Sequence, residues 1–152
     1  MAIEDDISLL ERVPTLSPLG RQALRILAIG AETRYVHSGD VLFKAGDDAE
    51  GGFVVQEGRF ALSSSAEGKE FTVGPCTLLG EVALFTETRR RATAKALEPS
   101  TVLCIPRPLF IRMLDSFPDS ARKLREILAA RLDQSTREFS SLRGALDAQE
   151  PE

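Results

Sequence analysis

The sequence predicts a mainly β domain with flanking helices, built around an antiparallel sandwich or barrel. From residue 34 to residue 105, short apolar runs alternate with glycine-containing turns at regular spacing, a pattern typical of antiparallel sheets. Before and after this stretch, apolar residues recur at helical spacing instead. We therefore expect an N-terminal helical segment at 1–33, a barrel at 34–105, a short and then a long helix at 106–146, and a frayed tail at 147–152.

Two short helices are expected before the barrel. Residues 3–13 carry apolar side chains at near-helical spacing, and Pro14 is expected to end this helix. Ser17 and Pro18 have the order of an N-cap and a first helical residue, so a second helix is expected to run from there to about Glu32. Its predicted buried face consists of Leu24, Leu27, Ala28 and Ala31.

Short strands are expected throughout the barrel. They lie at residues 35–37, 41–43, 53–55, 60–62, 70–73, 93–97 and 101–105. The strands at 53–55 and 60–62 are expected to pair as a hairpin. Gly39, Gly46 and Gly58 are expected to serve turns that need a positive φ, and not to contact a ligand.

The composition fits one acidic domain. The chain has 152 residues and a formal net charge of −4, from 19 Lys and Arg against 23 Asp and Glu. This balance argues against binding along a nucleic-acid backbone, which usually needs a basic excess. No apolar run approaches the roughly 18 residues of a membrane span, and the acidic start does not resemble a secretory signal. We therefore expect a cytoplasmic protein with no DNA partner and no membrane partner.

The inventory of reactive side chains argues against an enzyme. His37 is the only histidine, and nothing places a nucleophile or further metal ligands beside it. Cys76 and Cys104 are too few and too far apart for a disulfide framework or a zinc site, so we expect free thiols. We expect no catalytic residue, no metal and no cofactor.

The stretch from Gly80 to Thr93 has the chemistry of a site for a small anion that carries hydroxyl groups. Gly80 and Glu81 open it, a short apolar helical turn follows, and three arginines close it. Backbone N–H groups at the start of the turn, around Val82 and Ala83, can hold a phosphate. An arginine clamps a phosphate through its planar fork of donors, and a carboxylate accepts hydrogen bonds from sugar hydroxyls.

This stretch resembles the phosphate-binding cassette of the cyclic nucleotide-binding domain family, which includes catabolite-activator-type regulators, protein kinase regulatory subunits and gated channels. Gly80-Glu81 and Arg90-x-Ala92 fall on the family pattern, and a Lys-Ala pair further on selects Arg90 among the three arginines. The resemblance implies a jelly-roll barrel, also called a double-stranded β-helix. It also implies that Glu81 binds the ribose 2′-hydroxyl and that Arg90 binds the cyclic phosphate. We call residues 80–93 the cassette.

Arg91 departs from the family pattern, which usually has Ala, Ser or Thr at this position. Arg91 either adds a second phosphate clamp or blocks the pocket by its bulk, and the sequence leaves both possibilities open. Cys76 also stands where the loop before the cassette often has glycine. Because no Thr follows Arg90, the resemblance favours cAMP over cGMP as the ligand.

The C-terminal part is expected to form a dimer contact. The resemblance implies a hinge helix at 106–117 and a long helix from Asp119 to Leu146. Side chains on the long helix step by four and three residues, the pattern of a coiled-coil seam, and this favours a homodimer over an amphipathic helix folded onto its own barrel. The seam consists of Leu128, Leu132, Ser135, Phe139, Leu142 and Leu146.

The same helix is expected to supply the base end of the site. Alignment with the long helix of the catabolite activator puts Ser135 and Thr136 against the adenine and Arg131 near Glu81. The alternative, that Ser135 and Thr136 are simply small polar residues of the seam, stays open.

The sequence therefore favours a stand-alone cyclic nucleotide sensor that signals through its C-terminal helix, to an unknown partner or across a dimer. The chain ends at Glu152, which leaves no room for the recognition helix of DNA-binding relatives, so no DNA-binding domain is expected. The alternative is the same fold with a degenerate pocket, acting as a non-binding scaffold or dimerisation module.

Overall fold

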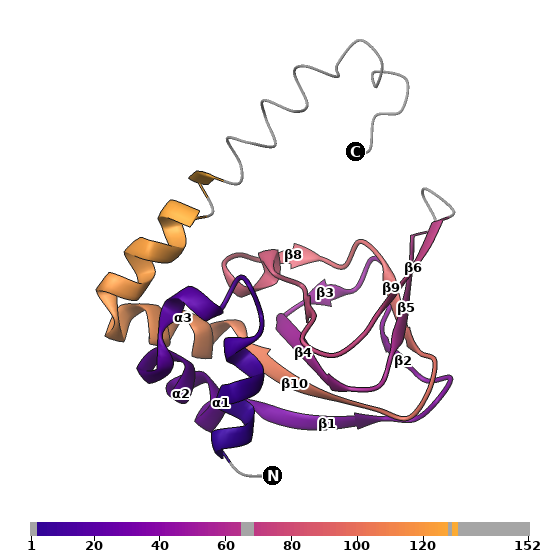
Figure 1. Cartoon of the computed structure of the whole chain (residues 1–152). Helices are drawn as coiled ribbons and strands as arrows, with labels where there is room; N and C mark the ends of the chain where they lie inside the picture. The colour runs from indigo at the N-terminus through magenta and orange to yellow at the C-terminus, as the bar shows by residue number, and fades with distance from the viewer. Residues whose placement is uncertain (1–2, 65–68, 128, 131–152) are drawn as a thin grey trace.

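The structure, a computed structural model, describes residues 3–64, 69–127, 129 and 130. Helices gather on one side of the molecule and strands on the other (Figure 1). The helices are α1 (Ile3–Glu11), the 3₁₀ turn η1 (Ser17–Leu19), α2 (Arg21–Gly30), the 3₁₀ turn η2 (Val82–Leu84) and α3 (Arg107–Ser116). Residues 118–127 are helical as well. Residues 65–68 and the predicted long helix beyond residue 130 lie outside the described residues.

The second helix, α2, differs from expectation at both its start and its end. Ser17 does not cap it, because residues 17–19 form the separate turn η1 and Gly20, with φ +91°, breaks the chain before α2 begins. The helix also ends at Gly30 and a strand begins at Glu32, two residues before the predicted change to strands at residue 34. The predicted buried positions 24, 27 and 28 are buried.

Two four-stranded antiparallel sheets and a small ribbon form the barrel, which confirms the mainly β prediction. The helix-facing sheet has the order β1 (Glu32–Val36), β10 (Ser100–Pro106), β4 (Gly51–Glu57), β7 (Leu78–Leu79). The outer sheet has the order β2 (Val41–Phe43), β9 (Thr93–Ala96), β5 (Phe60–Ser64), β6 (Lys69–Val73). The ribbon pairs β3 (Asp48–Ala49) with β8 (Thr88–Arg89).

The predicted hairpin between residues 53–55 and 60–62 is wrong. β4 pairs with β10 and β7, whereas β5 pairs with β6 and β9 in the other sheet. Gly58, with φ +95°, lies where the chain crosses from one sheet to the other, and a Cβ there would collide with the side chain of Ser100. The glycine was correctly expected to need a positive φ, but it serves a crossover between sheets.

In the helix-facing sheet, the central strand β4 is buried on both faces. Phe53 and Val55 of β4 pack between the two sheets, against Phe60, Ala94 and other side chains of the outer sheet. Val54, the residue between them, packs on the opposite face in the cluster formed with the helices. Because side chains alternate along a strand, β4 joins the barrel core to the helical layer.

Cys76 is the one residue other than glycine with a positive φ in the described part of the chain, at 68°. It follows Pro75 in a turn, and proline followed by a residue with positive φ is the type II turn pattern that favours glycine at the second position. A left-handed conformation costs an L-residue about 1–2 kcal/mol. The half-buried side chain of Cys76 packs against the helical core, so the residue combines a strained backbone with apolar contacts.

A buried carboxylate joins α1 to the helix-facing sheet. Asp6 is 6% exposed, and its Oδ1 accepts a hydrogen bond of 2.8 Å from Nε2 of Gln56 in β4. Burial raises the pKa of Asp6 above its ordinary value of 3.8, while the hydrogen bond from Gln56 opposes this shift.

We expect Asp6→Asn to raise the free energy of unfolding at neutral pH. Because the pKa of Asp6 is raised on folding, the folded chain binds this proton more tightly than the unfolded chain. That contribution to stability is complete below pH 3.8 and is lost as the pH rises through the folded pKa. Asn keeps an oxygen acceptor for Gln56 without the charge, so the two proteins should differ at neutral pH and converge at acid pH.

Urea titrations across a pH series measure this difference. Asp115→Asn, at an exposed position of α3, is the matched control and should show no such divergence. A loss of stability in Asp6→Asn at neutral pH would contradict the argument.

Candidate functional site

A cavity of about 240 Å³ lies against the cassette. It is lined by all seven cassette residues that the sequence singled out: Gly80, Glu81, Val82, Ala83, Arg90, Arg91 and Ala92. Phe43 of β2 and Leu62 of β5 line it from the outer sheet. The volume is somewhat below the about 300–1,000 Å³ typical of small-molecule sites, so the cavity suits a compact ligand.

Burial distinguishes Arg90 from its two arginine neighbours. Arg90 is 9% exposed, whereas Arg89 and Arg91 are exposed. Arg89 points to the ribbon, where its Nη1 donates to the carbonyl of Gly46 at 3.3 Å and its Nε lies 3.8 Å from Asp48. Arg89 and Arg91 also line the cavity, but only the central arginine of the three is buried, the one that the sequence selected.

The loop after β2 fixes the backbone of Arg90. Its N–H donates to the carbonyl of Asp47 at 2.8 Å, and its carbonyl accepts from the N–H of Gly46 at 2.8 Å. Gly46 has φ +95°, a conformation that glycine adopts without strain. The loop after β2 thus holds the backbone of Arg90 through two hydrogen bonds.

Aromatic rings hold the guanidinium of Arg90 in place. Its Cζ lies 4.4 Å from the ring centroid of Phe43 and 5.3 Å from that of Phe53. Nη2 donates to the carbonyl of Gly51 at 2.9 Å. Such cation–π contacts stabilise a desolvated cation by about 2 kcal/mol or more.

Two donors of this guanidinium remain without an acceptor. No hydrogen-bond acceptor among the described residues reaches Nε or Nη1 of Arg90, although both atoms are buried. Burial lowers the pKa of Arg90, yet a guanidinium stays charged in proteins. The site therefore presents a fixed positive charge with unused N–H groups.

The start of the cassette leaves room for that guanidinium because residue 80 has no side chain. Gly80 has φ +85°, and a Cβ on it would collide with Nη1 of Arg90. The half-buried Glu81 follows and precedes η2, the predicted helical turn. The N–H of Ala83 donates to the carbonyl of Gly80 at 3.1 Å, whereas Val82, 58% exposed, lies at the cavity.

Two contributors to the site were not identified from the sequence. Phe43 lines the cavity and stacks on Arg90, but an aromatic residue in a strand gives no signal beyond a core position. Arg107, at the start of α3, donates from Nε to the carbonyl of Ala83 at 2.9 Å and from Nη2 to the carbonyl of Ala49. The local sequence around this residue, Ile-Pro-Arg-Pro at 105–108, does not predict which carbonyl groups its side chain contacts.

The remaining predicted site residues lie outside the described residues: Arg131, Ser135 and Thr136. The whole predicted dimer seam, from Leu128 to Leu146, lies outside them too. Within the described part of the chain, no three His, Cys, Asp or Glu side chains are grouped to hold a metal ion. None of the helices described there is long and apolar enough to span a bilayer.

A buried arginine, with two donors unpaired among the described residues, shares a cavity of the small β-barrel with the carboxylate-bearing Glu81, and this arrangement suits the binding of a compact anion. The sequence pattern of the family described as "Cyclic nucleotide-binding domain" matches residues 33–117. This range exceeds half of the chain and contains the whole cassette. The chain belongs to the cyclic nucleotide-binding domain family, and its helix-flanked jelly-roll barrel is the fold of that family.

Solved and curated relatives agree with this assignment. The N-terminal domain of a transcriptional regulator from Streptomyces coelicolor superposes with a TM-score of 0.78 at 30% identity, over 86% of this chain and 94% of that one. The cAMP-dependent protein kinase regulatory subunit of Schizosaccharomyces pombe is 29% identical over 76% of this chain. A Neurospora crassa protein called lysophospholipase nte1 is 29% identical over 83% of it. The chain spans only 28% and 9% of the length of these two proteins.

We expect Gly80→Ala to displace the guanidinium of Arg90, and Gly39→Ala to leave it in place. Both glycines have a similar positive φ, +85° and +89°, so each substitution should cost about 1–2 kcal/mol of stability. Only at residue 80 would the new Cβ meet Arg90, because the space around a Cβ at Gly39 is open.

The side-chain Nε–H resonance of Arg90 reports its position, since the guanidinium lies over the ring of Phe43. This NMR signal should shift in Gly80→Ala and stay in place in Gly39→Ala, and urea titrations should show the larger loss of stability in Gly80→Ala, where contacts of Arg90 are lost as well. Equal spectra in the two variants would show that the cavity accommodates the methyl group without moving Arg90.

Proposed function

We propose that this chain is a cyclic nucleotide-sensing regulatory module that binds cAMP in preference to cGMP. The bound nucleotide changes the position of the C-terminal helix, which passes the signal across a homodimer or to a partner protein. The module binds its ligand without transforming it. For such a switch, the nucleotide must bind one arrangement of the helix more tightly than the other.

The observation that carries this proposal is the buried guanidinium of Arg90. Nε and Nη1 have no acceptor in the described part of the chain, and a buried charged donor left unsatisfied is costly. A cyclic phosphate supplies several acceptor oxygens and one negative charge, so it satisfies these donors and offsets the charge together. Arginine with phosphate forms charge-assisted and often bidentate hydrogen bonds.

Glu81 supports a ligand that carries a sugar. Its carboxylate accepts hydrogen bonds but donates none, and it lines the same cavity as Arg90. A ribose hydroxyl next to the cyclic phosphate supplies the matching donor. In this proposal Ser135 and Thr136 read the adenine and Arg131 orients Glu81, once the long helix covers the base.

The alternative is a scaffold with a degenerate pocket, in which Arg91 obstructs the ligand. Arg91 is exposed and lines the cavity. An exposed arginine at this margin attracts a phosphate through a solvent-screened charge, and this favours the binding module over the scaffold.

A thermal melt with saturating cAMP, and then with cGMP, tests the function. Ligand at about a hundred times its dissociation constant adds roughly 2.7 kcal/mol to stability, which raises the melting temperature by several degrees. We expect this rise in the wild type, more with cAMP than with cGMP at equal concentration. It should disappear in Arg90→Ala, which removes the phosphate donors.

Arg112→Ala is the matched control, because it removes an equal charge from an exposed position of α3 that does not line the cavity. This variant should retain most of the rise. Wild-type protein that is folded, yet shows no rise with either nucleotide, would leave the scaffold as the function.

We expect Arg91→Ala to weaken nucleotide binding only about two- to fivefold at low salt, the effect of one exposed charge. The difference from wild type should shrink as salt screens that charge. Isothermal titration calorimetry at two ionic strengths measures both effects. Tighter binding by Arg91→Ala would instead mean that the wild-type side chain obstructs the pocket.

A further inference from the structure

Arg107 joins the first turn of α3 to the cassette and to residues 49 and 50, which precede β4. Its Nε donates to the carbonyl of Ala83 at 2.9 Å, and its Nη2 donates to the carbonyl of Ala49. Its backbone N–H donates to the carbonyl of Glu50 at 2.9 Å. The side chain is half-buried, so these hydrogen bonds are partly shielded from water. A single residue thus connects three segments that are distant in sequence.

These acceptors tie Arg107 to both ends of the cassette. Ala83 belongs to η2, near the start of the cassette. Ala49 belongs to β3, and β3 pairs with β8 through the register Ala49 with Thr88. β8 leads directly into Arg90. The guanidinium of Arg107 therefore holds the first part of the cassette directly and the last part through one strand pair.

Arg107 and Arg90 also share one short backbone segment, residues 49–51. The carbonyls of Ala49 and Glu50 accept from Arg107, and the next carbonyl, that of Gly51, accepts from Nη2 of Arg90 at 2.9 Å. Gly51 packs so closely on the end of β10 that a Cβ would collide with the carbonyl of Ile105. With so little free space, a movement of Arg90 acts on the segment that holds Arg107.

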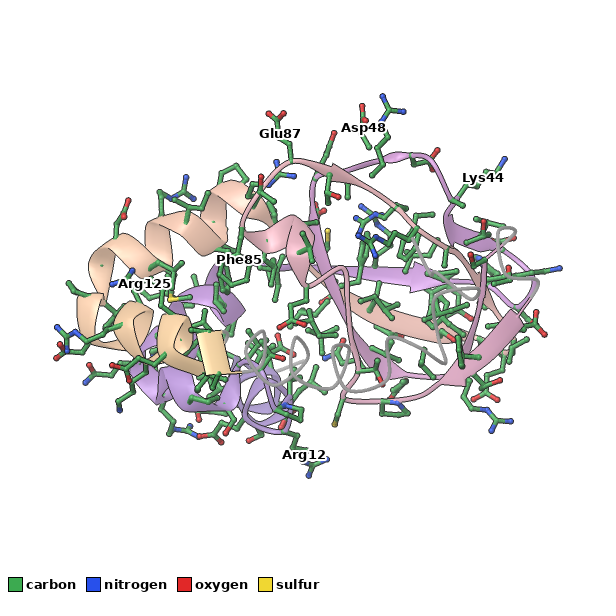
Figure 2. All side chains as sticks on the ribbon, turned by 90° about the horizontal axis from the view of Figure 1, so that it is seen from above. Arg12, Lys44, Asp48, Phe85, Glu87 and Arg125 are labelled. Carbon is green, nitrogen blue, oxygen red and sulfur yellow. The ribbon has the colours of Figure 1, made fainter. Side chains whose placement is uncertain are left out.

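An aromatic contact lies beside this connection. Phe85, which follows η2, meets Phe110 of α3 edge to face, with ring centroids 5.2 Å apart. Phe85 points toward the helices, whereas Glu87, two residues later, points outward (Figure 2). The contact between cassette and α3 is therefore apolar at Phe85 and polar at Arg107.

We propose that Arg107 is a positioning residue, which holds the cassette in register and transmits ligand binding at Arg90 to the start of α3. When a phosphate binds to Nε and Nη1 of Arg90, the guanidinium moves relative to the carbonyl of Gly51. The segment 49–51 follows, and Arg107 carries that movement to α3. The transmission rests on the proposed function, whereas the positioning of the cassette does not.

Amide hydrogen exchange without nucleotide tests the positioning. Arg107→Met removes both side-chain hydrogen bonds with a similar aliphatic stem, and we expect amides of residues 80–93 to exchange about tenfold faster or more. Arg112→Met, on an exposed arginine of the same helix, removes the same charge and should leave this exchange unchanged. Arg107→Lys keeps the charge, but a lysine cannot donate to both carbonyls through a planar fork. The exchange rate of residues 80–93 in this variant should therefore lie between those of Arg107→Met and Arg112→Met.

Saturating cAMP then tests the transmission. In the wild type, cAMP should slow exchange both in residues 80–93 and in residues 107–116. In Arg107→Met, at a concentration that saturates the variant, it should slow exchange only in residues 80–93. Circular dichroism checks folding, and Arg107→Lys replaces the Met variant if that one does not fold.

Two outcomes overturn the inference separately from the function. Wild-type exchange of the cassette in Arg107→Met would refute the positioning, and a wild-type response of α3 to cAMP in that variant would refute the transmission. If wild-type protein itself binds neither cAMP nor cGMP, the proposed function fails and the transmission fails with it. The comparison without nucleotide still decides whether Arg107 positions the cassette.

Discussion

The burial of one guanidinium governs the architecture around the cavity. Arg90 is the most deeply placed arginine of its cluster, and taking a charge out of water is costly unless other groups compensate. Each compensating group constrains a different element. The ring of Phe43 fixes β2, the carbonyl of Gly51 fixes the start of β4, and the missing side chain of Gly80 fixes the start of the cassette. The barrel edge is therefore built around this cation, which still retains unused donors for a ligand.

The helix-facing sheet lies between the barrel core and the helices. β4 packs Phe53 toward the barrel interior and Val54 toward the helices, so neither face is free to move alone. Dense packing on both faces makes such a strand rigid. The segment 49–51, which ends at the first residue of β4, receives hydrogen bonds from both Arg90 and Arg107. These hydrogen bonds therefore lie at the start of a rigid strand. In the proposed mechanism, a small displacement of residues 49–51 would reach Arg107 and α3 because β4 does not deform.

Much of the fold and of the site follows from local sequence patterns. Glycine turns and short apolar runs identified the longer strands, and the cassette pattern selected Arg90, which is the buried one of the three arginines. Local patterns say nothing about which strands pair, which is why β4 and β5 were placed in one hairpin although they lie in different sheets. The two-residue strands β3, β7 and β8 are too short to show any alternation. Arg107 went unnoticed because its acceptors are backbone carbonyls 24 and 58 residues away, and every residue type offers those.

The two arginines also interact through their charges. Burial is the main reason that the pKa of Arg90 is lowered, and the positive charge of Arg107 acts in the same direction, while Asp47 and Glu50 oppose it. Two cations held close to one backbone segment repel each other, and both are kept there by carbonyl oxygens that carry only partial charges. An anion bound directly to Arg90 adds a further negative charge at the guanidinium itself, and the weaker the screening in the buried site, the larger its effect. Ligand binding at the guanidinium of Arg90 would therefore weaken its repulsion of Arg107 and also change its hydrogen bonds. Both effects would act on Arg107 and favour a movement of the start of α3.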